Sequence, residues 1–120
     1  PGETWEQIRQ TLKFAEDINI DYVKIYAATP FPNTDLYNQA VKGGYLREDY
    51  NPNQHLWLES WIKSSHFTPE DLKMLRAYEW DRINFATPQK TAKIAKMMNI
   101  TEPRLDEIRK DTLARVHKKD

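Results

Sequence analysis

The chain has 120 residues, and its 18 Lys and Arg balance 18 Asp and Glu, so the formal net charge is zero. This length suits one ordinary domain, and the 4 Trp, 6 Tyr and 4 Phe argue against disorder. The absence of cysteine excludes a disulfide framework, a thiolate nucleophile and a cysteine-held iron–sulfur cluster within these residues. No apolar run approaches the roughly 18 residues that cross a bilayer, and no leader-like segment supports secretion. We therefore expect a cytoplasmic protein without a membrane partner. The neutral charge makes nucleic acid an unexpected partner as well.

The first predicted element is a helix over residues 5–18. Thr4 and Gln7 have the spacing of a capping box, and apolar residues then recur at helical intervals. Asn19 suits the left-handed position that ends a helix.

Residues 21–28 are dense in β-branched and aromatic side chains, which predicts a single strand. Alternation places Val23, Ile25 and Ala27 on the face that packs on helices, and Tyr22, Lys24 and Tyr26 on the opposite face. A lone strand needs a partner. Residues 55–62, read equally well as a strand or a loop, could supply it by folding back. The same strand of a second copy could supply it instead, so self-association of the isolated chain is expected.

Four further helices are predicted from their start signals. A threonine precedes each of them, and proline follows the threonine directly in two cases, as N-cap and N1 preferences favour. The predicted helices span residues 35–42, 69–85, 88–98 and 102–117. Gly43 and Asn99 are suited to end the first and third of them.

The last two predicted helices have the spacing of a helix-turn-helix. Ile94, Ala95, Leu105 and Ile108 would pack between them, with Asn99 in the tight turn. Three acidic residues lie in the first two turns of the second helix, where they would repel phosphate. Packing of two helices at a short turn is therefore the favoured interpretation. A small helical interaction or DNA-binding module is the alternative function.

Residues that bear chemistry are sparse. His55, His66 and His117 lie far apart without a two-ligand spacing, and no phosphate loop or nucleophile elbow is present. The four tryptophans are interpreted as core anchors. We assign no catalytic and no metal-binding residue.

Two loops at a matched spacing give residues 1–45 a family resemblance. Pro-Gly-Glu-Thr opens the chain before a helix, and Pro-Phe-Pro-Asn-Thr-Asp-Leu-Tyr follows the predicted strand at residues 30–37. This order resembles the C-terminal end of the radical S-adenosylmethionine barrel. The helical remainder is similar to the C-terminal extension of the cobalamin-dependent branch, which includes anaerobic magnesium-protoporphyrin monomethyl ester cyclases.

The resemblance implies a mainly α fold that is α+β at its N-terminal end. Residues 1–45 would be a helix–strand–helix remnant of the barrel, and residues 46–120 a helical extension. The parent would be an oxidoreductase or transferase that uses S-adenosylmethionine, a 4Fe–4S cluster and, in this branch, cobalamin. The residues whose family counterparts border the S-adenosylmethionine site are Gly2, Glu3, Thr4, Thr29 and Pro30.

Two departures from the family pattern limit what this chain could do. Asn33 replaces the usual loop glycine, although Asn tolerates a left-handed conformation. The three-cysteine cluster motif would lie upstream, together with the cobalamin domain, and these would be the partners of this chain. Pro1 in place of an initiator methionine fits that expectation of a longer protein. On its own the chain is expected to be inactive. For Glu3 and Thr4, helix capping is the simpler role.

Overall fold

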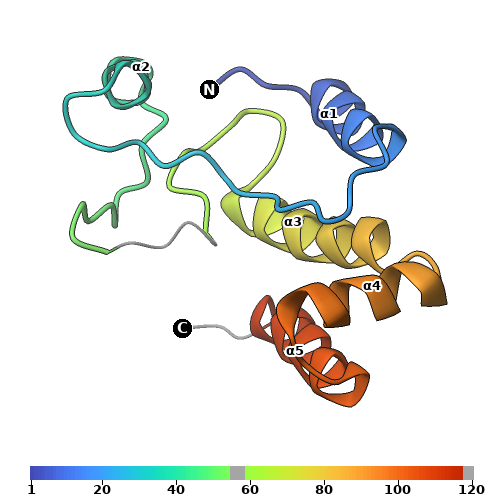
Figure 1. Ribbon diagram of the computed structural model, residues 1–120. Coiled ribbons are helices and arrows are strands. Elements are labelled where there is room, and N and C mark those ends of the chain that lie inside the picture. Colours follow the sequence, from blue (N-terminus) through green and yellow to red (C-terminus); the bar gives the residue numbers. More distant parts are fainter. Residues whose placement is uncertain (55–58, 118–120) are drawn as a thin grey trace. The chain divides into compact units, whose positions relative to one another are not determined.

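The structure, a computed structural model, describes residues 1–54 and 59–117. Within these residues it contains five helices and no run of paired strands (Figure 1). The helices are α1 (Trp5–Asp17), α2 (Asp35–Gly43), α3 (Pro69–Asn84), α4 (Pro88–Met98) and α5 (Glu102–Arg115). The predicted mainly α fold is confirmed, and every helix boundary lies within two residues of its predicted position.

Local capping chemistry explains where the helices begin and end. Thr34, Thr87 and Thr101 each accept a hydrogen bond from the backbone N–H three residues on, at 3.2 to 3.3 Å. Gly44 and Asn99 take the left-handed conformation, and their N–H groups return to carbonyls of the preceding turn. Short-range signals of this kind are readable from sequence.

The predicted strand over residues 21–28 is wrong for this chain. A strand requires a ladder partner, and none of the described residues supplies one. Instead, the side-chain carboxamide of Asn84 pairs with the backbone of Val23. Its Oδ1 accepts from the Val23 N–H at 2.7 Å, and its Nδ2 donates to the Val23 carbonyl at 2.7 Å. A guanidinium nitrogen of Arg76 donates to the Ile25 carbonyl at 3.2 Å. Side chains of α3 thus satisfy backbone groups that a neighbouring strand would otherwise pair.

The predicted alternation of faces holds over residues 23–26 but is wrong at Tyr22. Val23 is buried and Ile25 is half-buried, while Lys24 and Tyr26 are exposed. Tyr22, predicted on the face of Lys24, is half-buried and packs against buried side chains that include Phe85.

The segment predicted as a strand or loop over 55–62 lies partly outside the described residues. Its last residue, Ile62, forms an isolated antiparallel bridge with Leu46. The Arg47 N–H donates to the Trp61 carbonyl beside this bridge at 2.9 Å. The backbone of residues 61–63 thus pairs with residues 45–47, and no bridge to residues 21–28 is present in the described part of the chain.

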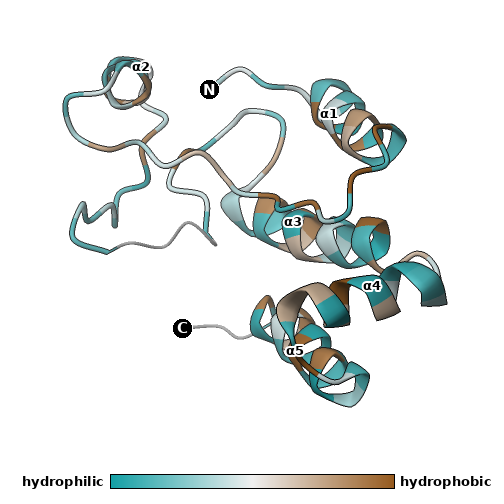
Figure 2. Ribbon diagram, viewed as in Figure 1, coloured by the Kyte–Doolittle hydropathy of each residue, from teal (hydrophilic) through white to brown (hydrophobic). Residues whose placement is uncertain are grey.

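The chain divides into two compact units, residues 1–9 with 26–73 and residues 10–25 with 74–120. The predicted domain division after residue 45 stays a prediction. In the second unit a cluster of buried side chains joins α4 and α5 through their apolar stripes (Figure 2). Its buried members are Phe85, Ile94, Ala95 and Leu105. Tyr22 and Trp80 pack against the cluster, and the Trp80 indole N–H donates to the Tyr22 hydroxyl at 3.0 Å.

Among residues 1–54 and 59–117, no helix combines the length and the apolar character that a membrane crossing requires.

Candidate functional site

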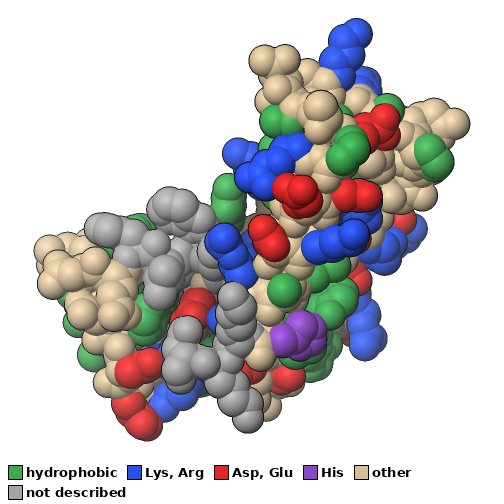
Figure 3. Space-filling view, turned by 90° about the horizontal axis from the view of Figure 1, so that it is seen from below, with side chains coloured by type: hydrophobic (Ala, Val, Ile, Leu, Met, Phe, Trp, Pro, Cys, Tyr) green, Lys and Arg blue, Asp and Glu red, His purple; other side chains and the backbone are tan. Residues whose placement is uncertain are grey.

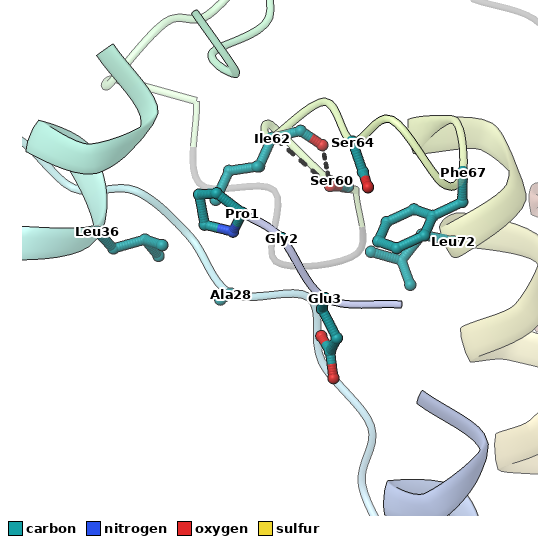
Figure 4. A pocket seen from close by; sticks show the side chains of 10 residues that line it. All are labelled: Pro1, Gly2, Glu3, Ala28, Leu36, Ser60, Ile62, Ser64, Phe67 and Leu72. Atoms are coloured by element: carbon teal, nitrogen blue, oxygen red, sulfur yellow. Dashed lines mark hydrogen bonds between the residues drawn. The ribbon is translucent and has the colours of Figure 1, made fainter. Parts of the chain in front are cut away.

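A cavity of about 90 Å³ lies in the first unit beside the N-terminal turn (Figure 4). Residues 1–3 form one side of it, Ala28 and Leu36 contribute further lining, and the segment 60–72 closes the rest. Folding therefore places residues 1–3 next to Ala28. All of α1 lies between them in sequence.

Gly2 and Glu3 are the predicted site residues that line this cavity. Gly2 has a φ of +85°, a conformation that favours glycine, and no heavy atom lies within 4 Å of where a Cβ would stand. Its backbone is therefore open to a close approach. Figure 4 shows the carboxylate of Glu3, an exposed residue, directed away from Ser60 and Ser64.

Thr4 has a structural task. Its Oγ1 accepts from the Gln7 N–H at 3.2 Å, while the Gln7 side chain accepts from the Thr4 N–H at 2.9 Å. This is the reciprocal capping box predicted from the sequence. The capping interpretation therefore describes Thr4.

Thr29 and Pro30 directly follow Ala28 in sequence. Ala28 lines the cavity, whereas Thr29 and Pro30 do not. The Pro30 carbonyl accepts from the Tyr50 hydroxyl at 2.6 Å, and the Thr29 carbonyl accepts from the Phe31 N–H at 3.0 Å. These bonds fix the loop that follows Ala28. Asn33 in the same loop has a φ of 67°, so it adopts the left-handed conformation that Asn tolerates.

The polar wall of the cavity comes from serines that the sequence analysis missed. The Ser60 hydroxyl donates to the Ile62 carbonyl at 2.9 Å, and the Ser64 hydroxyl accepts from the His66 N–H at 3.1 Å. No motif marks these serines, because only the fold of residues 60–72 brings them to the cavity.

An ion network holds the wall segment in place. Arg47 donates to both carboxylate oxygens of Asp49, at 2.9 and 2.6 Å, and also to Glu59 and the Ser60 carbonyl at 3.2 and 3.1 Å. Hydrogen bonding to Arg47 lowers the pKa of the Asp49 carboxyl. The guanidinium also lies 4.7 Å from the ring centre of the buried Trp61. The backbone around Ser60 is therefore anchored from several directions.

In the described part of the chain, no group of three or more His, Cys, Asp or Glu side chains could hold a metal ion. His66 and His117 belong to different units, and His55 lies outside the described residues.

The α4 and α5 helices are joined by the predicted tight turn and pack together. Asn99 is left-handed with a φ of 57°, Thr101 caps α5, and Leu105 is buried against α4 residues. Two arginines of α5 are nevertheless engaged by acids. Arg104 bonds Glu107 at 2.8 Å, and Arg109 bonds an Asp of α3 at 2.8 Å. On the face in Figure 3, basic and acidic side chains alternate without a continuous basic patch among the described residues. The turn between α4 and α5 thus serves to pack these two helices against each other.

We expect duplex DNA to bind this chain no better at low salt than at moderate salt. A phosphate-binding surface releases counterions and therefore loses affinity as salt rises, whereas paired charges release none. Fluorescence anisotropy of a labelled duplex, titrated at two salt concentrations, measures this. A strong affinity that falls with salt would support the DNA-binding alternative.

Part of the chain is similar in sequence to a known protein. Over 77 residues, 63% of this chain, the sequence is 36% identical to a Pyrococcus horikoshii protein named uncharacterized methyltransferase PH0819. The chain spans 17% of the length of that relative. No protein-family profile matches the chain, and no solved structure matches it.

Proposed function

We propose that this chain is the C-terminal part of a longer radical S-adenosylmethionine enzyme, in which residues 1–3 and Ala28 form one wall of the cofactor site. The observation that carries the proposal is that Gly2 and Glu3 line the same cavity as Ala28, although all of α1 lies between them. The similarity to a methyltransferase supports it, as does the small share of that relative's length that the chain spans.

The cavity fits one end of the cofactor and not the whole of it. A volume of about 90 Å³ is small beside a nucleoside joined to an amino acid. The residues that line the cavity are chemically suited to contact one end of S-adenosylmethionine. The Glu3 carboxylate is exposed and directed away from Ser60 and Ser64, so it is available to a hydroxyl or ammonium group of the cofactor that lies outside the cavity, and Gly2 leaves its backbone open. The remaining walls belong to the rest of the longer protein in this proposal.

The chain cannot hold an iron–sulfur cluster through cysteine, because it has none. The cluster cysteines, the rest of the barrel and a cobalamin domain are proposed to lie upstream in the same polypeptide, which we expect to be cytoplasmic. When bound, S-adenosylmethionine would supply a methyl group or, on reduction, a carbon radical. Methyl transfer is preferred to cyclisation because the relative is named a methyltransferase. Within this chain, Gly2 and Glu3 bind and orient S-adenosylmethionine, while Thr4 fixes the N-terminal turn through its capping box.

Replacing Glu3 by glutamine is expected to weaken S-adenosylmethionine binding to the longer protein about tenfold. A hydrogen bond to a charged group contributes about 1.5–3 kcal/mol, and about 1.4 kcal/mol corresponds to a factor of ten. Equilibrium dialysis with labelled S-adenosylmethionine measures the change.

The matched control is Glu48→Gln. Its side chain is 95% exposed and does not line the cavity, and its carboxylate lies 3.6 Å from the Lys63 ammonium group. Such a surface pair contributes little, so this variant should bind as the wild type does. Equal affinities of Glu3→Gln and the wild type for S-adenosylmethionine would show that the Glu3 carboxylate does not contact the cofactor.

A further inference from the structure

The cavity in the first unit is lined by apolar groups and by charge of one sign. Among the described residues that line it there is no lysine, arginine or histidine, and Glu3 supplies an acidic side chain. Apart from Gly2 and two serines, the other described residues of the lining are apolar. The Ser60 hydroxyl already gives its proton to the Ile62 carbonyl at 2.9 Å. A buried anion needs a partner of opposite charge, so this lining is suited instead to a compact cation with apolar substituents.

Phe67 contributes an aromatic ring to the lining. The residue is half-buried, and Figure 4 shows its ring and the Leu36 side chain on opposite sides of the cavity. The Trp5 ring packs against Phe67 in an edge contact, with ring centres 5.4 Å apart and an interplanar angle of 61°. In such a pair Trp5 covers at most one face of the Phe67 ring. Trp5 begins α1 directly after the Thr4 cap, so the capped N-terminal turn also fixes the angle of this ring.

We propose that Phe67 is a specificity-determining residue of the cofactor site, whose ring contacts the methylsulfonium group of S-adenosylmethionine. This inference rests on the proposed function and names the part of the cofactor that enters the cavity. A sulfonium is a compact sulfur cation with apolar substituents, here including a methyl group. The negative face of an aromatic ring attracts a ligand cation that lies within about 6 Å of the ring centre.

The other parts of S-adenosylmethionine are less suited to this cavity. Its amino acid carboxylate would find no basic side chain among the described residues of the lining, and the Pro1 nitrogen is an uncharged peptide nitrogen in the longer protein. The adenosine part carries several donors and acceptors that need partners. Both parts therefore lie outside the cavity in this proposal, where the exposed Glu3 carboxylate is available to them.

The positive charge on sulfur makes the contact selective. S-adenosylhomocysteine has the same adenosine and amino acid groups, but its sulfur is neutral and lacks the methyl group. The Phe67 ring therefore discriminates between the two ligands, because only one of them offers a cation. Glu3 does not discriminate in this way, since the hydroxyl and ammonium groups available to it are common to both ligands.

Affinities of the longer protein for S-adenosylmethionine and S-adenosylhomocysteine test this role of Phe67. We expect the wild type to bind S-adenosylmethionine about tenfold more tightly, and Phe67→Leu to lower that ratio to about two or less. Phe67→Tyr keeps an aromatic ring and should keep the ratio. Equilibrium dialysis with each labelled ligand provides the measurement. Because both ligands bind the same folded fraction of a variant, a partial loss of folding cancels in the ratio.

Phe31→Leu is the matched control. Phe31 belongs to the same unit, is 47% exposed and does not line the cavity, so both affinities should stay unchanged. Equal weakening of both ligands by Phe67→Leu, or equal affinities of the wild type for the two ligands, would overturn the inference. Glu3→Gln should weaken both ligands alike and so tests the proposed function separately. A wild type that binds neither ligand would contradict that function, and this inference with it.

Discussion

Replacing Asn84 by alanine is expected to lower the free energy of unfolding of the chain by about 3 kcal/mol. The Asn84 side chain is 3% exposed and makes three hydrogen bonds, two with the backbone of Val23 and one to the Trp80 carbonyl at 2.9 Å. Alanine leaves the buried Val23 N–H and carbonyl without partners, and each such group costs about 1–3 kcal/mol. Urea unfolding measures the change.

Two further variants make this result specific. Asn84→Asp keeps an acceptor for the Val23 N–H but loses both donated bonds, so its loss should be substantial as well. Asn38→Ala changes an exposed asparagine of α2 and should shift stability by less than about 0.5 kcal/mol. If Asn84→Ala were as mild as Asn38→Ala, its role as a substitute for a neighbouring strand would be wrong.

Leu105→Ala is expected to cost about 3 kcal/mol, within the range of roughly 2–5 kcal/mol for a buried leucine. Leu105 is 1% exposed, and its cluster mates Phe85, Ile94 and Ala95 are buried too. Truncation removes buried apolar area and leaves a cavity between α4 and α5. The same urea unfolding experiment provides the measurement.

Leu113, on the same helix but half-buried, provides the matched control. Leu113→Ala should cost clearly less than Leu105→Ala, because its site is open to water. Leu105→Met nearly conserves volume and should cost less than about 1.5 kcal/mol. Equal losses for the two alanine variants would mean that the α4–α5 contact is not the core of the second unit.

The helices could be predicted because their signals are local. Thr87 and Pro88 begin α4 and Asn99 ends it, and all three residues lie at the ends of that one helix. The same kind of information predicted the capping box at Thr4.

The missing strand and much of the candidate site depend on residues far apart in sequence. Asn84 lies 61 positions from Val23, and nothing in either sequence neighbourhood shows that a carboxamide replaces a strand. Ser60 and Ser64 reach the cavity only because residues 60–72 fold beside residues 1–3. Spacing within one segment carries no such information.

Of the site residues that the resemblance suggested, Gly2 and Glu3 line the cavity, whereas Thr4 forms a cap and the Pro30 carbonyl accepts from Tyr50. The assignment of Gly2, Glu3, Thr4, Thr29 and Pro30 to a cofactor site stays a prediction.

Reductive cleavage of S-adenosylmethionine by the longer protein tests the central claim most directly. The protein would be purified without oxygen, its iron and sulfide measured, and then incubated with S-adenosylmethionine and a chemical reductant. We predict that 5′-deoxyadenosine or S-adenosylhomocysteine forms only when the reductant is present. Product formation that does not require the reductant, or no product from protein with a full complement of iron and sulfide, would contradict it.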